Sequence, residues 1–180
     1  AGTSRGDERA VAQSSLARLR GEKANATIIA AIPESDADVK AALIRSTEAR
    51  NAKEAVDVLI DAATDESRRV RTESWRSISA LASSAKLETL VDMLIQTDDT
   101  NDMNRAEQAV VAVARRGDTA EASQLVMTKL KATKKPESKG ALIRVLGKLG
   151  EETALATIQK SLNQRNDEVK QASIAALSDW

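Results

Sequence analysis

Three arginines, Arg45, Arg76 and Arg144, stand at the same place in a pattern that recurs along the chain. Each of them follows an anchor residue of the pattern by six positions. The five anchors, which are spaced 31, 36, 32 and 31 residues apart, are Val39, Val70, Ala106, Ser138 and Val169. A guanidinium group can hold a carboxylate or a phosphate through two parallel hydrogen bonds. The three arginines are therefore candidates for binding an acidic partner.

The position six places after the anchor lies about 200 degrees round a helix from its apolar stripe, at ~100 degrees per residue. Arginines at this position point away from the core, and Arg115 lies close to the same face. They could instead pair with neighbouring carboxylates such as Glu48, and this second interpretation stays open. The candidate partner-binding face comprises Arg45, Glu48, Arg76, Gln108, Arg115, Arg144 and Lys148.

A group of acidic residues at helical spacing could be taken for paired catalytic carboxylates. The group consists of Glu54, Asp57, Asp61, Glu88 and Asp92. Carboxylates that share acid–base work need surroundings that separate their pKa values, and the sequence offers these residues no histidine, cysteine or tyrosine partner. We therefore favour a solvated helix face. We predict no catalytic residue, no metal site, no cofactor and no enzymatic activity.

Two further features have a functional and a structural interpretation. Trp75 stands where the other repeats have Ile or Val, which predicts packing between repeats, with an exposed stacking platform as the alternative. The segment 129–139 holds five lysines. A short basic run of this kind can contact phosphate or acidic lipid, but it is more often a solvated loop.

The composition excludes several classes of protein. The 180 residues contain 27 basic and 27 acidic side chains, so the formal net charge is zero and a generally basic nucleic-acid footprint is absent. There is no cysteine for disulfides or thiolate sites, and no histidine, the commonest metal ligand and general base. No apolar run approaches the roughly 18 residues of a membrane span. The partner that we predict is a protein or peptide and not a nucleic acid.

Pairs of helices must position these residues, because a period in the low thirties with helical spacing inside it is typical of a helical repeat array. We name the first helix of each pair A and the second B. The predicted A helices are 22–33, 52–64, 85–97, 119–132 and 151–163. The predicted B helices are 7–20, 37–50, 68–83, 104–116, 137–149 and 167–180. The predicted fold class is all-α, with about 11 helices in 5 pairs plus one N-terminal half repeat.

Aliphatic side chains must form the core, because the chain has no Phe, no Tyr and only two Trp. We expect Pro33 to end the first A helix, Pro136 to open a B helix, Gly150 to end that helix, and 97–102 to be a turn. The predicted core of the B helices is Val39, Leu43, Val70, Ile78, Leu81, Val110, Val113, Leu142, Val145, Leu146, Leu149, Val169 and Leu177. The predicted core of the A helices is Ile28, Ile32, Leu59, Leu90, Leu94, Leu125, Leu155, Ile158 and Leu162.

Val169 and Lys170 open a run of small and aliphatic residues that ends at Leu177. This run resembles the second helix of HEAT repeats, above all the short-period bacterial kind called HEAT-like or lyase-type HEAT. The segments 39–44 and 70–71 match it too, and the resemblance covers roughly residues 7–180. It implies a right-handed α-α superhelix, that is, an α-solenoid with the A helices on the convex side and the B helices lining the concave side.

The resemblance also implies a scaffold or binding module. We predict a non-catalytic protein–protein interaction scaffold that binds its partner through the concave B-helix face. The alternatives, which come from HEAT-like proteins of other function, are nucleic-acid binding of the DNA glycosylase kind and a bilin lyase or isomerase.

The repeats form one predicted domain, 1–180, with a half repeat at about 7–21 and pairs at 22–51, 52–83, 84–118, 119–150 and 151–180. Neither end has the polar outer face of a capping repeat, so we expect a piece of a longer protein whose bare ends, including Ile174 and Trp180, allow end-to-end self-association. The closing Ala-Leu-Ser-Asp-Trp resembles repeats of large bacterial multi-domain proteins, which favours an exported or periplasmic location over a cytoplasmic one.

Overall fold

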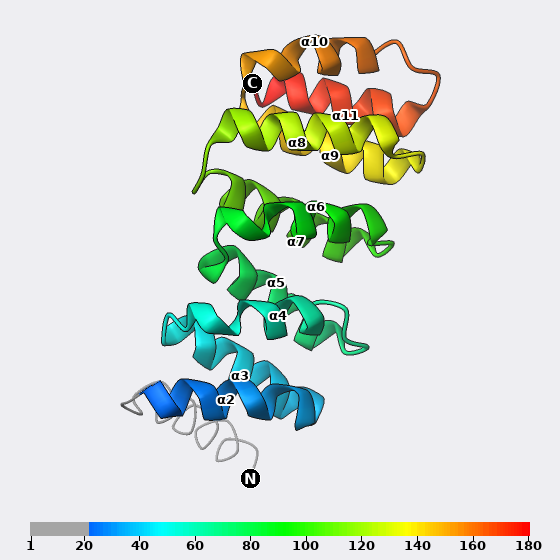
Figure 1. Ribbon diagram of the computed structural model, residues 1–180. Helices are drawn as coiled ribbons and strands as arrows, with labels where there is room; N and C mark the ends of the chain where they lie inside the picture. Colours follow the sequence, from blue (N-terminus) through cyan, green and yellow to red (C-terminus); the bar gives the residue numbers. More distant parts are fainter. Residues whose placement is uncertain (1–21) are drawn as a thin grey trace. The chain divides into compact units, whose positions relative to one another are not determined.

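The computed structural model describes residues 22–180, and this part of the chain is all α-helical (Figure 1). It contains ten α-helices, two short 3-10 helices and no strand, as the sequence predicts. The A helices are α2 (Glu22–Glu34), α4 (Val56–Ala62, preceded by the 3-10 helix η1, Lys53–Ala55), α6 (Leu87–Gln96, preceded by the 3-10 helix η2, Ser84–Lys86), α8 (Thr119–Ala132) and α10 (Glu152–Ser161). The B helices are α3 (Ala37–Ala49), α5 (Arg68–Leu81), α7 (Thr100–Ala114), α9 (Pro136–Leu149) and α11 (Asp167–Ser178).

The predicted and observed helix bounds differ most at α4, where the 3-10 helix η1 precedes Val56, and at α7, which begins at Thr100 and not at 104. The reason at α7 is Asp99, whose side chain accepts hydrogen bonds from the backbone N–H groups of Asn101 and Asp102 and so caps the helix. Half of the segment predicted as a turn is therefore helical. The predicted helix 7–20 lies outside the described residues.

Other helix ends follow from single residues. Asp36 caps α3 and Asp118 caps α8, each by accepting two backbone N–H hydrogen bonds. Pro136 occupies the first turn of α9, and Gly150 ends that helix at φ 72°, in the left-handed region that glycine adopts without strain. Pro33 lies in the last turn of α2, which ends one residue later.

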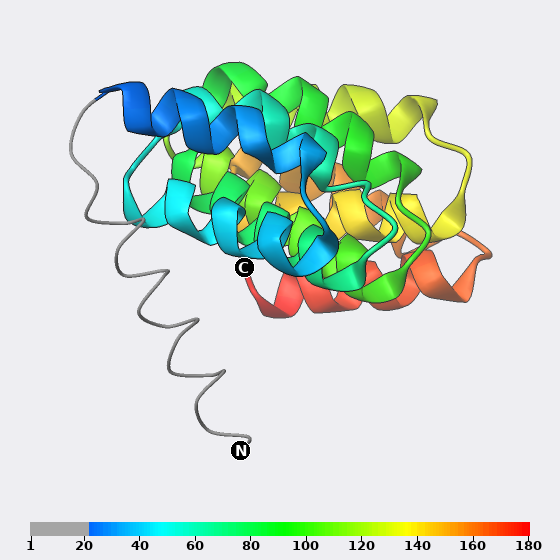
Figure 2. The same ribbon diagram turned by 90° about the horizontal axis from the view of Figure 1, so that it is seen from below.

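The helices form two compact units, one ending at Ala82 and the other running from Ser83 to Trp180. In the first unit α3 packs against α2 and α5, and α4 packs against α5. In the second unit α9 packs against α7, α8 and α11, and the views in Figures 1 and 2 agree in placing α11 alongside α9. Within each unit the B helices therefore contact one another directly, which brings residues of successive repeats together.

The core is aliphatic, with Trp75 added at 2% exposure, which confirms its packing interpretation. One anchor departs from the prediction. Val39 is 46% exposed, so its assignment to the core is wrong, whereas the anchors Val70 and Val169 are buried. The reason is that the described neighbours of α3, which are α2 and α5, leave this side chain in its first turn uncovered.

Several other predicted core residues lie nearer the surface. Five leucines are only partly buried, namely Leu125, Leu149, Leu155, Leu162 and Leu177. Ile174 and Trp180 are exposed, as predicted. Among the helices of residues 22–180, none combines the length and the apolar character that a membrane span requires.

Candidate partner-binding face

The candidate partner-binding face belongs to the B helices, but its members differ in how much they are exposed. Arg76 has 65% of its side chain exposed, whereas Arg45 and Arg144 have only about a quarter exposed. The seven residues lie as follows: Arg45 and Glu48 on α3, Arg76 on α5, Gln108 and the C-cap residue Arg115 on α7, and Arg144 and Lys148 on α9.

In the first unit, oppositely charged side chains link α3 to α5. Arg45 Nη1 lies 2.7 Å from Glu73 Oε1, and both side chains are mostly buried. Arg76 Nε lies 3.3 Å from Glu48 Oε2. The pairing with Glu48, which the sequence left as an open alternative, is therefore present.

These two ion pairs of the first unit differ in strength. Water and salt screen the Arg76–Glu48 pair, because most of the arginine is exposed, and exposed pairs of this kind contribute about 0–1 kcal/mol. The Arg45–Glu73 pair is better shielded from solvent, and its charged atoms lie 2.7 Å apart rather than 3.3 Å. Arg45 therefore helps to hold α3 and α5 together, while Arg76 can exchange its partner at little cost.

The second unit has a buried carboxylate at the centre of its charged residues. Glu107 on α7 is 2% exposed, and its Oε1 accepts hydrogen bonds from Arg144 Nη2 at 2.6 Å and Nε at 2.9 Å. Lys148 Nζ lies 3.5 Å from Glu107 Oε2, and Glu168 Oε1 on α11 lies 3.4 Å from Arg144 Nη1. Two cations next to the buried anion offset the cost of removing it from water.

The same contacts favour the charged form of Arg144. Burial of the guanidinium would lower its pKa, but the hydrogen bonds and attraction of Glu107, followed by those of Glu168, outweigh this effect. The pKa of Arg144 therefore lies above its ordinary value. Since Arg144 joins α7 to α9 and α11, its first role is to fix the three helices.

Arg115 and Gln108 complete the set in the second unit. Arg115 Nη2 donates a hydrogen bond to the backbone carbonyl oxygen of Lys148, with an N···O distance of 2.5 Å. Gln108 is exposed on α7. The structure thus brings Arg115, Arg144 and Lys148 together across α7 and α9, and Gln108 lies on the surface of α7.

Sequence reasoning missed the acidic partners Glu73, Glu107 and Glu168. A signal was available for Glu107, because it stands one place after its anchor, where the other repeats have Lys or Arg. Glu107 replaces a basic residue, and Arg144 follows it one repeat later. Such a pattern indicates an ion pair between neighbouring repeats. Glu73 and Glu168 carry no comparable signal.

Three acidic residues of the group at helical spacing, Glu54, Glu88 and Asp92, contact residues of the A helix of a neighbouring repeat. Lys129 lies 2.7 Å from Asp92 and 3.0 Å from Glu88, and the hydrogen bonds to these two carboxylates raise the pKa of Lys129. Glu54 accepts a hydrogen bond from Asn25 at 2.6 Å, and a backbone hydrogen bond together with this contact lowers the pKa of Glu54. In the part of the chain that the structure describes, no group of three or more Asp, Glu, His or Cys is placed to hold a metal ion.

Comparison with known proteins identifies a family to which part of the repeat array is similar. Residues 25–111, which extend from α2 into α7, match the family model of HEAT repeats. No curated protein matches the chain. HEAT repeats build helical scaffolds that often mediate protein interactions. This match, together with the regular alternation of A and B helices, supports assignment to the HEAT-repeat family.

Proposed function

We propose that this chain is a non-catalytic scaffold that binds a protein or peptide partner through the exposed side of its B helices. The observation that carries the proposal is the exposure of Arg76, which is 65% exposed and contacts the Glu48 carboxylate only at 3.3 and 3.4 Å, where solvent screens the pair. A carboxylate of a partner can replace Glu48 with a small loss of free energy, about 0–1 kcal/mol. Arginine is also among the residues enriched in protein interfaces.

The second unit supports the proposal with side chains of its own. Gln108 is exposed, and its amide can both donate and accept hydrogen bonds. Lys148 shares Glu107 with Arg144 at a longer distance, 3.5 Å against 2.6 Å, so it can turn towards a partner while Glu107 stays neutralised. These residues supply polar contacts without loss of the buried ion pair.

The buried ion pairs favour a rigid binding face. Arg45 joins α3 to α5 in the first unit, and Arg144 joins α7 to α9 and α11 in the second. A face that is already ordered loses less conformational freedom when a partner binds. The helices therefore present Arg76 and Gln108 from a fixed base in their respective units.

Site-specific photo-crosslinking tests the proposal. A photoreactive amino acid at Arg76 or Gln108 should capture one and the same protein from cell extract. The matched controls are Lys53 in η1 and Gln96 in α6, which are exposed residues on the A side of the same two units. Capture of that protein equally well from Lys53 and Gln96 would show that the B helices are not the binding side.

The purified partner then allows an affinity measurement. Arg76→Ala combined with Gln108→Ala should weaken binding by about fivefold or more, whereas Lys53→Ala combined with Gln96→Ala should leave it unchanged. A crosslinked product whose added mass is removed by nuclease would support the nucleic-acid alternative.

A further inference from the structure

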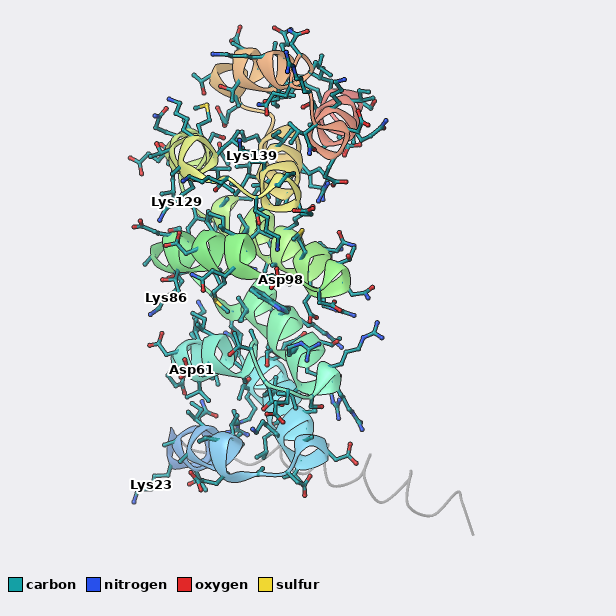
Figure 3. All side chains as sticks on the ribbon, turned by 90° about the vertical axis from the view of Figure 1, so that its right-hand side faces the viewer. Lys23, Asp61, Lys86, Asp98, Lys129 and Lys139 are labelled. Carbon is teal, nitrogen blue, oxygen red and sulfur yellow. The ribbon has the colours of Figure 1, made fainter. Side chains whose placement is uncertain are left out.

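A pocket in the second unit concentrates positive charge. Its volume is about 370 Å³, within the range of roughly 300–1,000 Å³ that small-molecule sites occupy. It lies between α8, α9 and α10, and its charged lining residues are Lys131, Lys139 and Lys160. No carboxylate lines it, so the three lysines give the lining a formal charge of +3. Figure 3 labels Lys139 between the ribbons of α8 and α9.

These three lysines have no ion pair with any residue in 22–180, unlike two other lysines of the segment 129–139. Lys129 pairs with Asp92, and Lys135 pairs with Asp98. Lys139 is also partly buried, which removes water from its charged side chain. Like charges without a counter-charge repel each other and reduce stability. The three lysines without a counter-ion therefore favour binding of an anion that is not part of residues 22–180.

The first unit contains a pocket at the same place in the repeat, and it shows that the fold does not require this charge. That pocket has a volume of about 220 Å³ and lies between α2, α3 and α4. Equivalent residues of the two pockets lie the same number of positions from an anchor, which is Val39 or Ser138 for the B helices and Val70 or Val169 for the A helices that precede them. The equivalent residues are Lys40 and Lys139, Asp61 and Lys160, Asp65 and Gln164, and Val58 and Thr157.

In the first pocket the lysine has its counter-ion inside the protein. Lys40 Nζ lies 2.8 Å from Asp65 Oδ2, and Asp61 also lines the pocket. One lysine and two aspartates give this lining a formal charge of −1. In the second pocket a lysine and a glutamine stand at the positions of these two aspartates, so the internal counter-ions are missing while the lysine at the start of the B helix is kept.

We propose that the pocket between α8, α9 and α10 binds a small anion that carries a phosphate group. Lysine ammonium groups bind phosphate as point charges, and three of them suit a compact, multiply charged phosphate better than a singly charged carboxylate. Thr157 and Gln164 add neutral hydrogen-bond donors to the lining. The Thr157 hydroxyl is only weakly engaged, by the sulfur of Met127 at 3.5 Å.

Calorimetric titration of the whole chain with inorganic pyrophosphate at low ionic strength tests the proposal. One molecule of pyrophosphate should bind, and Lys139→Gln should weaken binding by about tenfold or more, as expected for loss of one charged hydrogen bond. Lys53→Gln, which removes an exposed lysine elsewhere, is the matched control and should have no effect. Binding should also weaken as salt is raised, because Lys131 and Lys160 are exposed to solvent.

Exchange of residues between the two pockets sharpens the test. Lys160→Asp with Gln164→Asp gives the second pocket the acids of the first and should abolish binding. Asp61→Lys with Asp65→Gln gives the first pocket the residues of the second and should raise the stoichiometry from one towards two. All four side chains lie at or near the surface, and helix content by circular dichroism checks that each variant is folded.

The source of the phosphate requires a second measurement, which is sedimentation with phosphatidylcholine vesicles that contain phosphatidic acid. Vesicle binding that pyrophosphate displaces and Lys139→Gln weakens supports the pocket and assigns the phosphate to a lipid headgroup. Pyrophosphate binding without vesicle binding supports a soluble ligand. The proposal is overturned if pyrophosphate binds the Lys160→Asp, Gln164→Asp variant as tightly as the unaltered chain, if it does not bind at millimolar concentration, or if citrate binds equally well.

Discussion

The repeat formed by α2 and α3 and the repeat formed by α8 and α9 differ in what they bury. Ser46 and Thr47 on α3 stand at the positions of Val145 and Leu146 on α9, and all four side chains are buried. The two hydroxyls donate hydrogen bonds to carbonyl oxygens three residues earlier in their own helix, which satisfies them. Each of these two helical positions thus holds a hydroxyl side chain in one repeat and an aliphatic side chain in the other.

The surface pockets of the two repeats differ more strongly than the cores. The lining of the first pocket contains Lys40 with two aspartates, while that of the second contains three lysines and no acid. Asp61 and Lys160 are both exposed on their A helices, so a change of charge there does not disturb the packing. A repeat protein can therefore alter its ligand chemistry in one repeat and leave the neighbouring helices in place.

The largest expected effect concerns the buried position that the two repeats fill differently. Leu146→Ala should lower the free energy of unfolding by about 2–5 kcal/mol, because it removes buried methyl groups and leaves a cavity. Thr47→Ala should cost only about 0.5–1.5 kcal/mol, the usual loss for one satisfied hydrogen bond. Urea denaturation followed by circular dichroism measures both. Equal losses would mean that the two helices do not use this position differently.

The next effect concerns the charged B faces of the two units. Arg144→Met should cost about 1.5–3 kcal/mol, because buried Glu107 loses its charged hydrogen bonds and keeps only the more distant Lys148. Arg76→Met should cost about 0–1 kcal/mol, since its contact with Glu48 is screened by solvent. Adding Glu107→Gln to Arg144→Met should recover part of the loss. A cost as large for Arg76 as for Arg144 would contradict its proposed freedom to bind a partner.

The sequence was sufficient to predict most helix bounds, because the apolar period and the terminal residues act locally. Gly150 illustrates this, since its left-handed conformation ends α9 where expected. The error at α7 was local too, because Asp99 is a good capping residue that was assigned to a turn. Val39 failed for a different reason: its exposure depends on which helices cover it, and a repeat pattern does not contain that information.

The helix positions of the charged residues in the candidate partner-binding face followed from the sequence, but their ion-pair partners, apart from Glu48, did not. Helical spacing placed Arg45, Arg76 and Arg144 on the B helices, as the structure has them. Their carboxylate partners come from the next or preceding repeat, about 24–37 residues away in sequence, as for Arg144 with Glu168 and Glu107. Such contacts depend on how the repeats stack, which spacing within one helix cannot reveal. The pocket lysines were noted only as part of a basic run, because α10 contributes Lys160 from a later repeat.

A smaller effect separates the two pocket lysines. Lys40→Met removes the ion pair with Asp65 and should lower the free energy of unfolding by about 0.2–1 kcal/mol. Lys139→Met removes a cation without an ion pair among the described residues, so it should have no cost or a slight stabilising effect. Thermal unfolding in low salt compares the two variants. If Lys139→Met were as destabilising as Lys40→Met, the second pocket would contain a counter-charge of its own.

The smallest effect is the acid dependence of the first pocket, which the second pocket lacks. Burial alone would raise the pKa of Asp65, but the hydrogen bonds from the Lys40 ammonium and the Ser67 N–H outweigh it, so the pKa lies below its ordinary value. The folded state therefore binds this proton less readily than the unfolded chain. The resulting stabilisation is fully present above the unfolded pKa of about 3.9 and is lost as the pH falls through the lower pKa of the folded state.

Asp65→Asn isolates this contribution, because asparagine does not titrate. Between pH 5 and 3 the unaltered chain should lose more stability than Asp65→Asn, by a fraction of the roughly 0.2–1 kcal/mol that such a pair contributes. Lys40→Met should reduce the loss as well, since without the ammonium the pKa of Asp65 moves back towards that of the unfolded chain. Gln164→Glu in the second pocket should create a similar acid dependence where none exists, because the new carboxylate would lie in the same lining as Lys139. If urea midpoints at pH 5 and pH 3 shift equally in the unaltered chain and in Asp65→Asn, the Lys40–Asp65 contact does not persist in solution. The Lys40–Asp65 ion pair would then not explain how the first pocket differs from the second.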